Sequence, residues 1–195
     1  TWEWSGTWQR MSPPVSPPAY TYTAMAYDAA RQRVVLHSAT STWAYDGMTW
    51  ADVSSPIHPS TGRWDAMAYD AARQRVVLFG GGSRGETWEW DGTTWAQANP
   101  GSSPAPRSFH VMAYDPVRQR VVLFGGKVES NPDGETWEWD GSAWSQEQMS
   151  IGPDPRSGHA MAYDRARGQI LLQGGSIGDH DGDLAVGTWL WNGDL

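Results

Sequence analysis

The sequence predicts an all-β fold, a β-propeller built of four-stranded antiparallel blades, and two repeated motifs carry this prediction. The tetrapeptide Met-Ala-Tyr-Asp recurs at intervals of 42, 45 and 49 residues, beginning at Met25, Met67, Met112 and Met161. A Trp-rich segment around an Asp-Gly turn lies between the copies, at 42–50, 87–95 and 136–144. Because no useful length of chain has an apolar period of 3.6 residues, repeats of this size indicate blades rather than helical units.

One repeat, residues 63–98, shows the expected strands in order. Residues 66–69 form a short strand that a polar turn closes, and residues 75–79 are a continuous apolar run, typical of a strand buried on both faces. Residues 87–90 alternate with period two, which places both indoles on one side of a third strand. Asp91-Gly92 indicates a tight hairpin, because glycine accepts a positive φ, and it leads into a fourth strand at 94–97.

Counting strands in this way predicts 17 strands in about four blades. The expected units are listed by their residues: 1–11 (partial blade), 20–53, 63–98, 107–148 and 156–195 (incomplete blade). Three arrangements are compatible with this count: a fragment of a larger ring, a chain that pairs with a second copy to close a larger ring, and a self-closed four-blade monomer. Unpaired strand edges at the first and last units would favour homo-oligomers.

The repeat resembles the kelch family. A glycine pair follows the second strand, as at Gly80-Gly81, and is followed by two Trp separated by six residues, as in Trp88 to Trp95. The likeness extends over essentially the whole chain and is similar to that of bacterial kelch-type proteins, although the first blade has His37-Ser38-Ala39 where the others have the glycine pair. The resemblance implies a propeller of four-stranded blades and favours an extracellular or periplasmic location.

Composition excludes several classes of protein. The 195 residues include 14 Trp and no Cys, so neither a disulfide framework nor a Cys-ligated metal can form. A net charge of −8 offers no basic stripe for phosphates, so nucleic acid and anionic membrane surfaces are not expected as partners. Apolar runs of about four residues are far shorter than the roughly 20 that a membrane helix needs.

Differences between the repeats point to a binding face. The first-to-second and third-to-fourth turns are alike in all blades, whereas the second-to-third and blade-to-blade loops vary in length and chemistry. Variable loops on one rim of a rigid scaffold are typical of recognition surfaces. We therefore expect a non-enzymatic module that binds a protein or peptide. The alternatives are a carbohydrate-binding propeller or part of a polysaccharide-acting enzyme, and an engineered or truncated propeller without a ligand.

The candidate ligand-binding residues lie at the entrance to the innermost strands. Trp64 is the one Trp outside the Thr-Trp motifs, and Tyr22 and Phe109 occupy the same position in other blades. Aromatic rings at a channel mouth can stack on sugars, clamp a peptide or simply plug the channel. The next residue in each blade is polar, and Asp65, His110 and His159 are therefore candidates for the same site, with packing between strands as their alternative role.

No catalytic residues are predicted, because the sequence has no nucleophile elbow and no phosphate-binding glycine loop before a helix. A single acidic segment is the candidate cation site. Asp179, Asp181 and Asp183 alternate along the loop and could supply hard oxygen ligands to Ca²⁺, or they could form a solvated acidic loop. No other cofactor is expected.

Overall fold

The computed structural model describes residues 1–38, 41–59, 63–81, 83–178 and 183–193, and these residues form 19 β-strands without a helix. In this part of the chain no helix is therefore available to span a membrane. The strands are β1 (Trp2–Trp4), β2 (Trp8–Arg10), β3 (Ala24–Asp28), β4 (Arg33–Ser38), β5 (Ser41–Tyr45), β6 (Trp50–Asp52), β7 (Ala66–Asp70), β8 (Arg75–Phe79), β9 (Thr87–Trp90), β10 (Trp95–Ala98), β11 (Val111–Asp115), β12 (Arg120–Phe124), β13 (Lys127–Val128), β14 (Asn131–Pro132), β15 (Thr136–Trp139), β16 (Trp144–Glu147), β17 (Ala160–Asp164), β18 (Gln169–Gln173) and β19 (Thr188–Trp191).

These strands form a four-blade β-propeller arrangement, as the sequence predicts. Three blades are four-stranded antiparallel sheets, in the orders β3-β4-β5-β6, β7-β8-β9-β10 and β11-β12-β15-β16. The fourth blade has the strands β17-β18-β19, and β1 with β2 forms a separate hairpin. The count of 17 expected strands is exceeded by two, because the long loop between β12 and β15 contains the small hairpin β13-β14.

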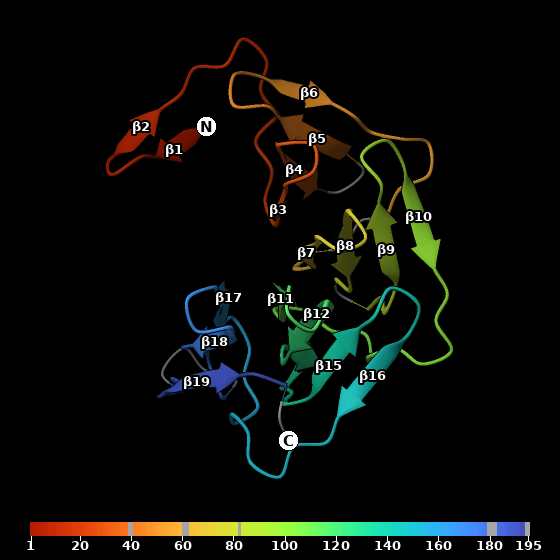
Figure 1. Cartoon of the computed structure of the whole chain (residues 1–195), viewed down its shortest axis with the longest axis vertical. Helices are drawn as coiled ribbons and strands as arrows, with labels where there is room; N and C mark the ends of the chain where they lie inside the picture. Colours follow the sequence, from red (N-terminus) through yellow and green to blue (C-terminus); the bar gives the residue numbers. More distant parts are fainter. Residues whose placement is uncertain (39–40, 60–62, 82, 179–182, 194–195) are drawn as a thin grey trace.

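The blades follow one another around an arc (Figure 1), with β3, β7, β11 and β17 on its inner side. Each of these inner strands contacts the next one in the series. The β1-β2 hairpin is tied to the first blade by side-chain hydrogen bonds, from Tyr45 Oη to Glu3 at 2.6 Å and from Trp50 Nε1 to Thr1 Oγ1 at 2.8 Å. In Figure 1 this hairpin and the fourth blade lie at the two ends of the arc.

Three of the four cores among the described residues lie between two blades and join two unlike faces. The fourth, around Trp43 and Trp50, is formed by residues of the first blade. The face of one blade that carries small and aliphatic residues packs against the Trp-rich face of the next blade. Between the second and third blades these residues are Ala66, Ala68, Val77 and Phe79 on one side, and Met112, Leu123, Trp137, Trp139 and Trp144 on the other. At these three boundaries the indoles are buried against a neighbouring blade, which is why repeats of this kind stabilise each other.

The Trp residues of the hairpin depart from this pattern. Trp90, Trp95 and Trp139 are at most 2% exposed, whereas Trp2 and Trp8 are 60% and 66% exposed. The Trp residues of the hairpin therefore do not pack between blades as those of the second and third blades do. Its strands carry the motif without a full neighbouring sheet to cover it.

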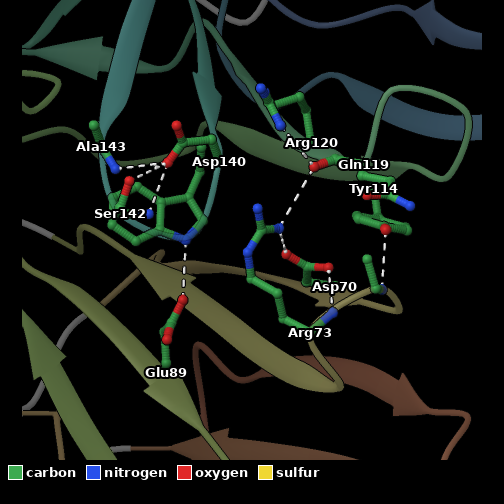
Figure 2. A network of polar contacts seen from close by, with 11 residues as sticks. Asp70, Arg73, Glu89, Tyr114, Gln119, Arg120, Asp140, Ser142 and Ala143 are labelled. Atoms are coloured by element: carbon green, nitrogen blue, oxygen red, sulfur yellow. Dashed lines mark hydrogen bonds and ion pairs between the residues drawn. The ribbon is translucent and has the colours of Figure 1, made fainter.

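Repeated polar turns connect neighbouring blades on one face. Arg73 forms an ion pair with the buried Asp70 and donates to the backbone oxygen of Gln119 in the next blade at 3.5 Å (Figure 2). The hydroxyl of Tyr114 accepts a hydrogen bond of 3.0 Å from the backbone N–H of Ala72. The Asp and Arg repeats of the sequence thus serve blade-to-blade docking, which accounts for their similarity from blade to blade.

Candidate binding site

The aromatic residues at the entrance of the inner strands share an unusual backbone conformation. Tyr22, Trp64 and Phe109 have φ values of 61°, 64° and 58°, and Gly158, at the same position of the fourth blade, has 65°. Phe109 N–H donates to the Trp64 carbonyl at 3.3 Å, and Gly158 N–H donates to the Phe109 carbonyl at 2.9 Å. A positive φ on a bulky residue costs on the order of 1–3 kcal/mol, so blade docking holds these residues in place.

This conformation brings three rings from three blades into one continuous group, which we call the aromatic stack (Tyr22, Trp64 and Phe109). The centroids of Tyr22 and Trp64 are 4.7 Å apart in an edge arrangement, and those of Trp64 and Phe109 are 4.6 Å apart in a stacked one. Tyr22 is 44% exposed and Phe109 is 37% exposed. The stack therefore presents an apolar surface to solvent, although each ring comes from a different repeat.

The two ends of the aromatic stack differ chemically. At one end the Arg63 guanidinium lies 5.5 Å from the Tyr22 ring centroid, within range of a cation–π contact. Beyond Phe109 the next blade has Gly158, and a Cβ added there would meet no atom within 4 Å. The stack thus begins beside a cation and ends next to open space.

Asp65 follows Trp64 directly and is half-buried. Burial raises the pKa of Asp65 from 3.8 to about 7. A carboxyl group with this pKa changes charge near neutrality, so the polarity beside the aromatic stack depends on pH.

The two candidate histidines lie elsewhere, in the packing between blades. His110 and His159 are 4% and 5% exposed, and their rings contact Phe79 and Phe124 with centroid distances of 5.7 and 5.4 Å. Among the described residues their ring nitrogens have no hydrogen-bond partner. Burial is the main cause that lowers the pKa of His110 to about 3 and that of His159 to about 4, so both are uncharged at neutral pH.

His110 also explains a glycine of the repeat. A Cβ added to Gly80 would lie 2.8 Å from His110 Cε1, and one added to Gly126 would lie 2.8 Å from His110 Cβ. Both glycines have a positive φ. Gly80 and Gly126 therefore leave room for the side chain of His110, directly before β11. The structure does not bring the two histidines into the exposed aromatic surface.

The candidate calcium loop is described only in part. Asp179 and Asp181 lie outside the described residues. The exposed Asp183 accepts hydrogen bonds through its backbone oxygen, from Ile177 N–H at 2.8 Å and from Ser176 Oγ at 3.2 Å. Within the described ranges, no three His, Asp or Glu side chains gather in a way that could hold a metal ion.

An ionic network around the buried Arg107, close in sequence to Phe109 of the aromatic stack, was not predicted from the sequence. Arg107, with a fully buried side chain, donates to Asp133 at 2.9 Å and to Glu135 at 2.7 Å, while Trp137 Nε1 donates to the same Glu135 at 2.8 Å. Burial acts to raise the pKa of Glu135, but the hydrogen bonds from Trp137 and Arg107 outweigh it and lower that pKa. The only sequence signal is a Glu before the Thr-Trp motif of the second and third blades.

This network anchors the variable loops. Arg107 belongs to a blade-to-blade loop and Asp133 to the β12–β15 loop, and Gly81 N–H donates to the Arg107 carbonyl at 3.1 Å. Ser108, which precedes Phe109, exchanges two backbone hydrogen bonds with Lys127 at 3.1 and 2.7 Å. The loops that differ most between repeats are thus connected to the aromatic stack through two residues.

Comparison of the sequence with models of known protein families and with curated proteins finds no match to either.

Proposed function

We propose that the protein is a non-enzymatic binding module that holds a protein or peptide partner against the aromatic stack. The observation that carries this proposal is the alignment of Tyr22, Trp64 and Phe109, from three blades, into one partly exposed group with strained backbones. Core packing can be achieved without such conformations, and local strain is most often retained at ligand sites. Exposed contiguous aromatic surface favours association with another polypeptide.

The ring geometry favours a peptide over a carbohydrate. A pyranose stacks on a free aromatic face, but Trp64 is stacked with Phe109 and is also in edge contact with Tyr22. The outer side of Phe109, towards Gly158, is the open one. A phenyl face without a polar group fits an apolar or proline side chain, and Arg63 can pair with a carboxylate of the same partner.

We further infer that the repeat is of the kelch type. The glycine pairs at Gly80, Gly125 and Gly174 all adopt a positive φ in both members, as tight exits from the second strand require. The two Trp separated by six residues lie on neighbouring strands and pack in the cores between blades. These backbone and packing features support the resemblance to kelch repeats.

The experiment is a selection of phage-displayed random peptides on the immobilised chain, run beside an array of oligosaccharides. We expect selected peptides with an apolar or proline residue, and an affinity reduced about ten-fold or more in Phe109→Ala and Trp64→Ala. Trp8→Ala, which removes an exposed indole in the β1-β2 hairpin, is the matched control and should bind as the wild type does. The proposal would be contradicted if only oligosaccharides bound to the aromatic stack and no peptide did. It would also be contradicted if neither variant changed the affinity for the selected peptides.

A further inference from the structure

Two buried arginines, Arg107 and Arg156, occupy equivalent positions before the inner strands of the third and fourth blades. Both are 0% exposed. Arg107 donates through Nε to the backbone oxygen two residues before it and through Nη1 to the Gly125 oxygen, both at 3.1 Å. Arg156 makes the same two bonds, at 3.0 Å to the oxygen two residues before it and at 3.2 Å to Gly174. The two guanidinium groups therefore have the same orientation in their blades.

The carboxylates that neutralise Arg107 come from the loop between β12 and β15. Asp133 accepts from Arg107 Nη1 at 2.9 Å, and Glu135 Oε2 accepts from Arg107 Nη2 at 2.7 Å. The same Glu135 oxygen accepts from the indole Nε1 of Trp137 at 2.8 Å. A guanidinium and an indole N–H thus enclose one carboxylate oxygen in the third blade.

Backbone hydrogen bonds identify the counterparts of these two acids in the fourth blade. Asp133 N–H donates to the second glycine of its blade's glycine pair at 2.9 Å, and Ala185 N–H makes the same bond in the fourth blade at 2.9 Å. Gly187 stands two residues further on, directly before β19, as Glu135 stands directly before β15. Both carboxylates are therefore replaced by residues without a polar side chain. These positions precede β19, so their identity is independent of any residue after 195.

The replacement leaves Arg156 Nη2 buried without a hydrogen-bond partner among the described residues. A Cβ added to Gly187 would lie 3.6 Å from the indole Nε1 of Trp189 and would meet no other atom within 4 Å. Trp189 is the counterpart of Trp137, the indole that donates to Glu135. The fourth blade thus keeps both donors of the site and has open space where the third blade has the glutamate side chain.

We propose that Arg156 and Trp189 bind a carboxylate on a short aliphatic stem, either a free short-chain carboxylate or the glutamate side chain of a polypeptide partner. One carboxylate oxygen accepts from Arg156 Nη2 and Trp189 Nε1. A buried cation without a counter-charge is costly, and a bound carboxylate removes that cost through charge-assisted hydrogen bonds. The third blade defines the occupant, because the same two donors there enclose the side chain of Glu135.

The test titrates the ¹⁵N-labelled chain with sodium propionate at constant ionic strength, because propionate has the atoms of a glutamate side chain from Cβ onward. We expect the indole N–H resonance of Trp189, assigned with Trp189→Phe, to shift with saturation and a dissociation constant on the order of 10 mM. The resonance of Trp137 should stay in place, since its N–H already donates to Glu135. Propionamide, the neutral isostere, should bind about ten-fold more weakly or less.

Two variants change the site in different ways. Arg156→Met removes the cation and should weaken propionate binding about ten-fold or more. Ala185→Asp supplies a carboxylate at the position of Asp133, so it should weaken binding similarly while raising the melting temperature, and it tests the site even if Arg156→Met does not fold. Arg84→Met removes the exposed cation that pairs with Glu86 and is the matched control, with an expected change below about two-fold.

A second pair of probes distinguishes the two sources of the carboxylate. These probes are the blocked peptides acetyl-Gly-Glu-Gly-amide and acetyl-Gly-Gln-Gly-amide. Binding of the Glu peptide at least as tight as that of propionate assigns the site to a side chain of a partner, and weaker binding assigns it to a free carboxylate. The Gln peptide should bind about ten-fold more weakly than the Glu peptide if a side chain is the ligand.

Several outcomes would overturn the proposal. These are no saturable shift with propionate or the Glu peptide, equal binding of propionate and propionamide, and binding retained in both Arg156→Met and Ala185→Asp. Binding that appears only when Asp179→Asn and Asp181→Asn are combined would assign the site to carboxylates of the chain itself and would also overturn it. Phe109→Ala should bind propionate as the wild type does, so this proposal and that of the aromatic stack can fail separately.

Discussion

Trp144 donates its indole N–H to Thr87 Oγ1 across the boundary between two blades, over a distance of 2.9 Å. The side chains are buried, with 2% of Trp144 and 1% of Thr87 exposed. The boundary between the second and third blades therefore contains a buried side-chain hydrogen bond in addition to buried apolar surface.

Replacing this acceptor should weaken the boundary measurably. Thr87→Val keeps the shape of the side chain but leaves the Trp144 N–H unpaired, so we expect a loss of about 1–3 kcal/mol in the free energy of unfolding. Urea unfolding monitored by circular dichroism measures this loss. Thr87→Ser retains the hydroxyl and should lose clearly less, and equal losses in both variants would show that the hydrogen bond contributes nothing.

The buried guanidinium of Arg107 should be the most sensitive charged group near the aromatic stack. Arg107→Met removes the cation that faces Asp133 and Glu135, and breaking such a pair costs on the order of 3 kcal/mol. Arg84→Met, which breaks the exposed pair with Glu86, is the control and should cost less than about 1 kcal/mol. Thermal unfolding of both variants tests this ranking, and a similar shift in Tm for the two would refute it.

Burial of His37 should make the stability of the fold sensitive to acid. Burial, and secondarily the charge of His58, lowers the pKa of His37 from 6.5 to about 4. Below about pH 6.5 the unfolded chain binds a proton that the folded chain does not, so stability falls as the pH drops towards 4. The second and third blades have Phe79 and Phe124 at the same register position.

The variant His37→Phe should therefore remove this loss. We expect it to gain about 2 kcal/mol more, relative to wild type, at about pH 5 than at about pH 7.5. Denaturant titrations at the two pH values give the difference, in which the constant effect of the larger apolar ring cancels. A gain that is the same at both values would show that His37 does not titrate with the lowered pKa.

Asp65 should have the opposite pH dependence. Burial raises its pKa to about 7, so the folded chain keeps a proton that the unfolded chain loses near pH 3.8, and stability decreases as the pH rises from about 4 to 7. Asp65→Asn should be more stable than wild type by on the order of 4 kcal/mol at about pH 8, with little difference near pH 4. The comparison of unfolding midpoints at these two values measures the effect, and a difference that does not change with pH would contradict it.

The sequence predicted the blades well because their strands depend on local patterns. The apolar run of Arg75–Phe79, the alternation of Thr87–Trp90 and the turn at Asp91-Gly92 each identify an element without information from the rest of the chain. The β13-β14 hairpin was missed because its strands have only two residues each, too few to show a period.

The candidate site was predicted in part. Tyr22, Trp64 and Phe109 could be grouped by their shared position in the repeat, and the structure brings them into contact. His110 and His159 share the following position, but the chain turns them into the core between blades. The direction of each histidine side chain depends on the positive φ of the residue before it, Phe109 or Gly158. The residue types at these positions do not predict that conformation.

By itself, the sequence determined that this chain repeats a four-stranded antiparallel unit, because the alternation of side chains along a strand and the turn residues act over a few positions. Only the tertiary structure decided which residues of different blades meet: Trp144 with Thr87, Arg107 with Glu135, and Trp64 with Phe109. These contacts depend on how far each blade rotates against the next, and that rotation results from packing over the whole boundary rather than from any single motif.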